Sequence, residues 1–198
     1  YDYSQAGLYF ITICCQDRAH LFGKIINSKM ELNSYGEIAY QEWFATEKIR
    51  ENCVSHEFIV MPNHIHGILE ILFKNGESQP GEFKSPSQTI GSIIRGYKIA
   101  TIKKIKDKIL KENNSTVESQ FDPNQRNPNQ RTGESQFDSN LRTGELQFAP
   151  TKKIIQLDFK IWQRNYYEHI IRDERAYQRI SKYIINNPAK WDKEKRRN

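Results

Sequence analysis

The sequence has few cysteines and no long apolar run, and each shortage excludes a class of protein. Only three of the 198 residues are cysteine, Cys14, Cys15 and Cys53. This odd, small number without metal-ligand spacing argues against a disulfide framework and a structural zinc site, and favours reduced thiols in a cytoplasm. No run of 18 apolar residues occurs, so we expect no membrane span, and no signal peptide is visible.

Positive charge exceeds negative charge, but only in two stretches. The net charge is +6, from 30 Lys and Arg against 24 Asp and Glu. Residues 95–112 carry seven basic residues against two acids, and residues 150–198 carry thirteen against six. The excess favours nucleic acid as a partner, with a location at the nucleoid. Solvated helix faces would explain such charges equally well.

Apolar periodicity predicts an alternation of strands and helices. We expect strands at 8–15, 53–61 and 64–72, with residues 21–26 as a short hairpin partner of the first. Helical spacing predicts helices at 34–50 and 85–111. An extended stretch follows from 154 to 171, and a helix from an N-cap at Asp173 to about Asn187, where Pro188 stops it.

A polar, repetitive stretch interrupts this pattern at about 113–150. It contains RTGESQF at 131–137 and RTGELQF at 142–148. Such a composition buries too little apolar surface to order itself, so we interpret it as a disordered insertion. The remaining order of elements predicts one domain over residues 1–198 in the α+β class. Its core is a ferredoxin-like βαββαβ antiparallel sheet with an added C-terminal helix.

Three groups of residues are candidates for chemistry. His64 and His66 alternate on a strand, so both imidazoles project from one face and suit a single divalent cation. By spacing alone, a surface or hydrogen-bonded pair is the more common case. Tyr183 and Asn187 are four residues apart on the predicted last helix and share a face. There the phenol suits a nucleophile and the amide suits a metal ligand. By spacing alone, however, a Tyr183 packed against the sheet beside Ile180 and Ile184 is the far more common case.

The third group is the segment 161–172, in which aromatic and basic residues alternate. Trp162, Tyr166 and Tyr167 lie among Arg164 and Arg172, a composition that suits base stacking and phosphate binding. A core strand with its polar positions in water is the alternative.

Together these segments resemble the REP-associated tyrosine transposases, single-tyrosine enzymes with a His-hydrophobic-His motif. The matching segments follow the family's order: YFITICCQDRAHLFG (9–23), VMPNHIHGILEI (60–71), GSIIRGYKIATIKKI (91–105), IWQRNYYEHIIRDE (161–174) and YIINNPAKW (183–191). They cover most of the chain outside the insertion, whose length departs from the family pattern.

The resemblance implies the role of each site residue. His64 and His66 correspond to the metal ligands, Tyr183 to the nucleophile, and Asn187 to a third ligand for Mg²⁺ or Mn²⁺. His169 matches a family histidine to which we assign no chemistry. Tyr166, Tyr167 and Tyr177 are rival nucleophiles that rank lower.

The resemblance also implies the substrate, single-stranded DNA near palindromes that fold into hairpins, cut through a 5′-phosphotyrosine bond and rejoined. We expect a monomer or homodimer, no membrane partner, and DNA contacts from the basic helix, from residues 190–197 and from the aromatic segment. The DNA-binding candidates are Arg95, Lys98, Lys103, Lys104, Trp162, Arg164, Tyr167 and Arg172.

Three alternatives remain. One is a single-stranded nucleic-acid-binding module without catalysis. Another is a replication initiator with the same metal pair and nucleophile, although no helicase or origin-binding domain is seen in the sequence. The last is a structural zinc protein, which the Cys and His spacing disfavours.

Overall fold

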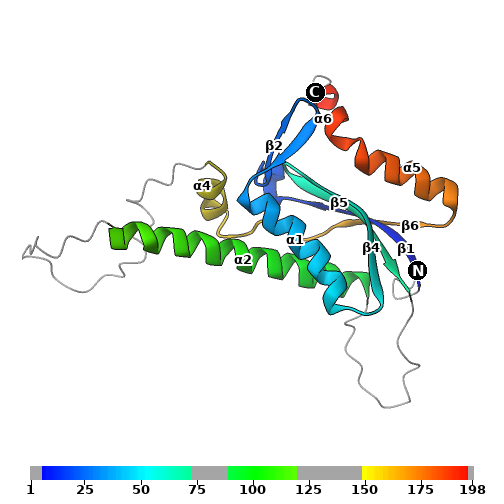
Figure 1. The fold of residues 1–198 in the computed structure, drawn as a ribbon, viewed down its shortest axis with the longest axis horizontal. Coiled ribbons are helices and arrows are strands. Elements are labelled where there is room, and N and C mark those ends of the chain that lie inside the picture. The colour runs from blue at the N-terminus through cyan, green and yellow to red at the C-terminus, as the bar shows by residue number, and fades with distance from the viewer. Residues whose placement is uncertain (1–5, 73–88, 120–148, 196–198) are drawn as a thin grey trace, which may run out of the picture.

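The computed structural model describes residues 6–72, 89–119 and 149–195 (Figure 1). Its centre is an antiparallel sheet in the order β4-β5-β1-β6. The strands are β1 (Gly7–Cys14), β4 (Cys53–Met61), β5 (His64–Ile71) and β6 (Tyr167–Ile171). With α1 between β1 and β4, and α2 between β5 and β6, this is the ferredoxin-like βαββαβ order. The predicted fold class is therefore confirmed.

Two helices cover one face of the sheet (Figure 1). Helix α1 (Ser34–Ile49) follows its N-cap, Asn33, whose side chain accepts hydrogen bonds from the backbone amides of Tyr35 and Gly36 in the first turn. Helix α2 (Ile90–Ser119) packs its apolar side chains into the core: Ile90, Ile93, Ile94, Tyr97 and Ile105 are buried, and Ile102 is partly buried. Between helices and sheet lies the larger core, which includes Tyr9, Ile11, Ile13, Ile65, Leu69, Trp43, Ile93 and Tyr97.

The opposite face of the sheet carries helix α5 (Glu174–Ile185). The Asp173 side chain accepts a hydrogen bond from the Ala176 amide at 2.7 Å, which confirms the predicted N-cap. The apolar cluster beneath α5 is small and consists of Ile68, Ile171, Ala176, Ile180 and Ile184. A second helix, α6 (Asn187–Lys195), follows at once.

The structure corrects two predicted elements, the hairpin partner at 21–26 and the extended stretch from 154 to 171. Strand β2 (Gly23–Ile26) pairs with β3 (Lys29–Leu32) in a separate hairpin, not with β1. A short 3-10 helix, η1 (Gln16–Arg18), lies between β1 and β2. Helix α4 (Ala149–Gln156) replaces the first part of the predicted extended stretch, which becomes a strand only at β6.

The bounds of two further predictions also change. Helix α2 continues through 113–119, which we assigned to the disordered insertion, and residues 149–150 begin α4. The rest of that insertion, 120–148, and the predicted helix start at 85–88 lie outside the described residues. None of the helices that the structure describes is long and apolar enough to cross a membrane.

Candidate active site

The two histidines of strand β5 meet on the sheet face that carries α5. Strand alternation points His64 and His66 to this face and Ile65 to the larger core. Their Nε2 atoms are 3.1 Å apart, and their side chains are buried at 9% and 5% exposure. The pair is thus a preformed feature of the sheet, and a loosely held surface pair is excluded.

A polar neighbour holds the other nitrogen of each ring. The Asn63 Oδ1 atom lies 2.7 Å from His64 Nδ1, and Thr12 Oγ1 lies 2.8 Å from His66 Nδ1. An amide oxygen only accepts, so His64 Nδ1 carries the proton and His64 Nε2 presents its lone pair. Thr12 stands beside His66 because the two are register partners of β1 and β5.

Burial keeps both imidazoles neutral. It lowers the pKa of His64 to about 4, with a smaller contribution from the positive charge of Arg18. Burial, and then the neighbouring His64, lower the pKa of His66 to about 3. Neutral imidazoles at pH 7 are the form that binds a metal ion.

Tyr183 reaches the pair from helix α5. Its Oη atom lies 3.3 Å from His66 Nε2, and the two ring centroids are 5.2 Å apart. Phe10 supports the phenol ring edge-on at 6.1 Å, and the Lys190 ammonium lies 5.6 Å from the ring centroid. Tyr183 is 37% exposed, so this side of the site is open to solvent.

Asn187 does not lie on the same helix as Tyr183, contrary to the prediction. Helix α5 ends at Ile185, Asn186 is its C-cap, and Asn187 begins α6. Pro188 therefore occupies the first turn of a new helix, where its missing amide hydrogen costs nothing. The Asn187 side chain is buried at 8% exposure, and its role as a ligand stays a prediction.

The two Nε2 atoms fit a shared cation. Adjacent ligands that bind one ion at about 2.1 Å lie about 3 Å apart, as these nitrogens do. Within residues 6–72, 89–119 and 149–195, no third His, Cys, Asp or Glu completes the group. A cation here would need further oxygen ligands from an amide, a phosphate or water.

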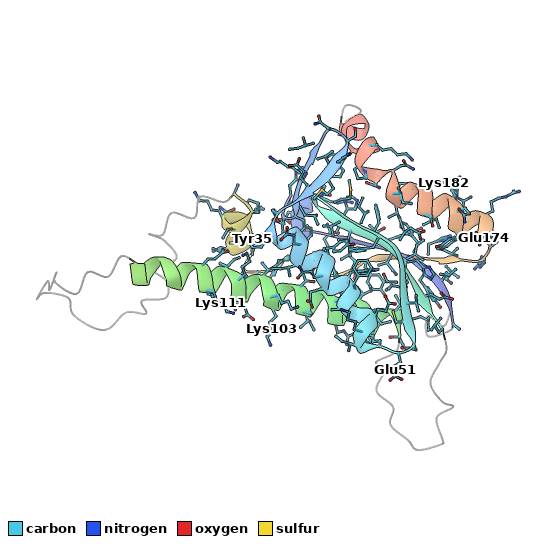
Figure 2. The ribbon with its side chains drawn as sticks, viewed as in Figure 1. Tyr35, Glu51, Lys103, Lys111, Glu174 and Lys182 are labelled. Atoms are coloured by element: carbon cyan, nitrogen blue, oxygen red, sulfur yellow. The ribbon has the colours of Figure 1, made fainter. Side chains whose placement is uncertain are left out.

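The predicted basic residues of α2 lie on the other side of the sheet from this site. Arg95, Lys98, Lys103 and Lys104 belong to the helix that packs against α1, as the positions of Lys103 and of Lys182 on α5 show (Figure 2). Lys98 donates to the backbone carbonyls of Gln163, Arg164 and Asn165 at 2.8, 3.1 and 3.2 Å. Lys104 pairs with the buried Glu42. These two ammonium groups therefore stabilise the fold, while Arg95 and Lys103 are exposed.

The aromatic segment is divided between the core and the site face. Trp162 is 6% exposed and packs against Phe22 and Tyr97, at ring distances of 5.0 and 5.7 Å, so its prediction as a DNA-stacking residue is wrong. Tyr167 is 58% exposed and pairs in register with Thr12, on the same face as His66. Arg164 and Arg172 are exposed.

The rival tyrosines lie further from the histidines or are held elsewhere. Lys98 Nζ lies 5.8 Å from the Tyr166 ring centroid, on the α2 side. The Tyr177 hydroxyl binds Glu57. Tyr167 has its ring 6.2 Å from Phe10, and His169 is exposed at the register position opposite Phe10.

Sequence reasoning missed three residues around the pair, Thr12, Asn63 and Trp191, and included Lys190 only as the first residue of the basic tail. The Trp191 ring on α6 lies 5.8 Å from the His64 ring and 5.7 Å from the His20 ring. Asn63 had a signal, because it directly precedes His64 in a strand-to-strand turn. Thr12 had none, because strand register is not legible in one sequence.

Comparison with known proteins places the chain beside one relative in sequence and two solved structures. An uncharacterized protein of Haemophilus influenzae is 34% identical over an alignment of 203 residues. The alignment covers 98% of this chain and 87% of the relative. A REP-associated tyrosine transposase bound to a REP hairpin is 15% identical, with a TM-score of 0.49 over 96% of this chain and 71% of that one. A candidate transposase from Deinococcus radiodurans R1 is 12% identical, with a TM-score of 0.41 over 94% of each chain. The chain matches no family model. From its identity and coverage with the first of these proteins, the chain belongs to the same family as the Haemophilus influenzae protein.

Proposed function

We propose that the chain is a transposase-like enzyme of the REP-associated tyrosine type, which nicks and rejoins single-stranded DNA. One observation carries this proposal: the Tyr183 hydroxyl lies 3.3 Å from His66 Nε2, which in turn lies 3.1 Å from His64 Nε2. These three groups come from two distant stretches of the chain. Their convergence favours a nucleophile beside a cation site over a tyrosine that only packs.

In the proposed reaction the Tyr183 oxygen attacks the scissile phosphorus and the phenol gives up its proton. One phosphodiester replaces another: the 5′-phosphotyrosine bond forms, the bond from phosphorus to the 3′ oxygen breaks, and that oxygen takes up a proton to become a free 3′-OH. The exchange needs no external energy, and attack by a 3′-OH reverses it to join strands. The partial exposure of Tyr183 and the nearby Lys190 ammonium suit the approach of an anionic backbone.

His64 and His66 would hold Mg²⁺ or Mn²⁺, with Asn187 as the predicted third ligand. When bound, the ion would supply positive charge to the phosphate oxygens. The mixed nitrogen and oxygen donors suit Mn²⁺ somewhat better. The lowered pKa values of both histidines support this assignment, because a neutral imidazole need not give up a net proton to bind a cation. The Asn63 contact at His64 Nδ1 also leaves the lone pair of His64 Nε2 towards the pair.

Tyr167 is the DNA-binding candidate that strand pairing places on the face of the site. Tyr167 stands two strands from His66 in one row across the sheet, about 10 Å away at the usual strand spacing. Its exposed ring suits stacking on an unpaired base beside the scissile phosphate. Arg95 and Lys103, on the opposite side of the sheet, would meet a different segment of a hairpin-forming substrate.

The test is a covalent adduct between the protein and labelled single-stranded hairpin DNA in Mn²⁺, detected on a denaturing gel. We expect wild type to form the adduct, Tyr183→Phe to form none, and EDTA to abolish it. Tyr40→Phe is the matched control, because Tyr40 is an exposed tyrosine on α1 at the other face. An adduct that survives in Tyr183→Phe contradicts the assignment, and DNA binding without any adduct in wild type would favour the non-catalytic module.

A further inference from the structure

A polar cluster joins the first half of helix α5 to the edge strand β4. The Tyr177 hydroxyl lies 3.0 and 3.3 Å from the two Glu57 carboxylate oxygens and 3.4 Å from His56 Nδ1. The His56 ring packs edge-on against the Tyr177 ring at 5.8 Å. Burial, and then the Glu57 carboxylate, raise the pKa of the Tyr177 phenol. The hydroxyl therefore stays protonated and donates a hydrogen bond to Glu57.

A strand irregularity makes this cluster possible. The β4–β5 register shifts between Ser55 and Phe58, so the two residues between them depart from regular pairing. In a regular strand His56 and Glu57 would point to opposite faces, whereas here both reach Tyr177. The other nitrogen of His56, Nε2, lies 2.8 Å from Glu70 Oε2, which connects the cluster to the neighbouring strand β5.

Apart from the contacts of Tyr183 with His66 and Phe10, the packing of α5 on the sheet is chiefly aliphatic. Its apolar cluster consists of small and aliphatic side chains, chiefly Ile180 and Ile184 of the helix against Ile68 and Ile171 of the sheet. Aliphatic contacts are not directional, so they define where the helix lies better than how it is rotated about its axis. Hydrogen bonds from Tyr177 are directional and supply that second constraint.

Tyr177 and Tyr183 lie on opposite flanks of this apolar stripe. They are six positions apart in the sequence, which corresponds to about 9 Å along the helix axis and about 120° around it. Tyr177 contacts β4 on one flank, and Tyr183 contacts His66 of β5 on the other. A roll of α5 that separates Tyr177 from Glu57 therefore also shifts the Tyr183 hydroxyl relative to His66.

We infer that Tyr177, Glu57 and His56 form a clamp that sets the rotation of helix α5 and so holds the Tyr183 hydroxyl beside the histidine pair. Tyr177 is then a positioning residue, not a rival nucleophile. The inference rests on the proposed function for its consequence in catalysis. Its geometric part concerns the helix alone and is testable without catalysis.

Two substitutions remove the clamp and one preserves it. Tyr177→Phe removes the donor and keeps the ring, Glu57→Leu removes the acceptor, and Glu57→Gln keeps an oxygen that accepts the same hydrogen bond. Gln178→Ala is the matched control, because it removes an exposed hydrogen bond to Glu174 at 2.7 Å on the same helix without touching the sheet.

The first measurement is the rate constant of adduct formation at saturating hairpin DNA, beside the dissociation constants for DNA and Mn²⁺. We expect Tyr177→Phe and Glu57→Leu to slow the reaction about tenfold or more, because misplacement of a reacting group by about 1 Å is this costly. Both dissociation constants should stay at wild-type values. Glu57→Gln and Gln178→Ala should react at close to the wild-type rate.

The second measurement is amide hydrogen exchange in the last turn of α5, residues 181–186. We expect faster exchange in Tyr177→Phe and Glu57→Leu than in Gln178→Ala, whether or not the protein cuts DNA. Wild-type rates and wild-type exchange in both clamp variants would overturn the inference, as would a lower melting temperature with an unchanged rate. If Tyr177→Phe does not fold, Glu57→Leu against Glu57→Gln decides. Wild type without an adduct contradicts the proposed function, and the exchange data still decide whether the clamp exists.

Discussion

At the scale of single residues, the site depends on the groups behind the two imidazoles. Asn63 and Thr12 bind the Nδ1 atoms of His64 and His66, and so fix both the ring rotation and the nitrogen that faces the cation site. A histidine without such a partner rotates about two side-chain bonds, and part of its metal-binding free energy is lost in ordering the ring. These contacts therefore affect metal affinity without touching a metal.

Replacement of Thr12 by valine tests this role. The change keeps the shape of the side chain and removes the hydroxyl that lies 2.8 Å from His66 Nδ1. We expect Mn²⁺ to bind about 10- to 100-fold more weakly, the usual loss when such an outer contact is removed. Titration calorimetry measures the affinity directly.

The control for this substitution is Thr101→Val. Thr101 is buried, and its hydroxyl donates to the Tyr97 carbonyl within α2, on the other face of the sheet. An equal loss of Mn²⁺ affinity in both variants, or none in either, would show that Thr12 does not orient the ligand.

At the scale of elements, the sequence predicted what periodicity determines. The bounds of β4 were predicted as 53–61, and α1 was placed to within one residue, because α1 keeps a helical period over its whole length and β4 ends directly before Pro62. The β2–β3 hairpin was missed because its turn uses Asn27 and Ser28 at positive φ, of 49° and 60°, without the glycine that marks most such turns. Helix α4 was missed because it is short.

The candidate site was predicted in part for the same reasons. Strand alternation placed His64 and His66 on one face, since this needs only local geometry. The break between Tyr183 and Asn187 was not foreseen, because Pro188 ends one helix and equally well begins another. The Glu57–Tyr177 contact depends on a register shift between two strands, which one sequence does not encode in a legible way.

Strand β5 has a glycine next to the histidine pair, and its lack of a side chain is a packing requirement. A Cβ atom at Gly67 would lie 2.4 Å from Trp43 Cζ2 and 3.0 Å from Phe58 Cδ2. Trp43 is stacked on Phe58 at 4.5 Å and buried, so it cannot move aside cheaply. We expect Gly67→Ala to destabilise the fold by about 1–3 kcal/mol, which denaturant unfolding measures.

Gly91→Ala is the control for that substitution. Its new Cβ would lie 3.6 Å from the Tyr166 hydroxyl, an ordinary contact, in the first turn of α2. Alanine there restricts the unfolded chain, so we expect unchanged or slightly higher stability. A Gly67→Ala protein as stable as Gly91→Ala would mean that the Trp43 ring has room to shift.

At the scale of the whole molecule, the sheet separates stability from chemistry. One face carries α1, α2 and the larger core, and the other carries α5 with its smaller cluster and the histidine pair. Two polar imidazoles are thus buried on the less extensively packed face. Their burial favours the neutral form, so the fold as a whole must depend on pH.

The sign of this dependence follows from the two lowered pKa values. In the unfolded chain each histidine takes up a proton near pH 6.5, whereas in the fold the pKa of His64 is about 4 and that of His66 about 3. Below pH 6.5 the unfolded state therefore binds more protons, so this part of the stability is complete above that pH and is lost as the pH falls towards 4. Between pH 7.5 and 5 we expect each histidine to remove about 2 kcal/mol from the free energy of unfolding.

Urea unfolding in EDTA, which excludes bound metal, measures the loss. The His64→Asn, His66→Asn double variant should show a much flatter dependence over this range, and a slope equal to that of wild type would mean that other groups carry the effect.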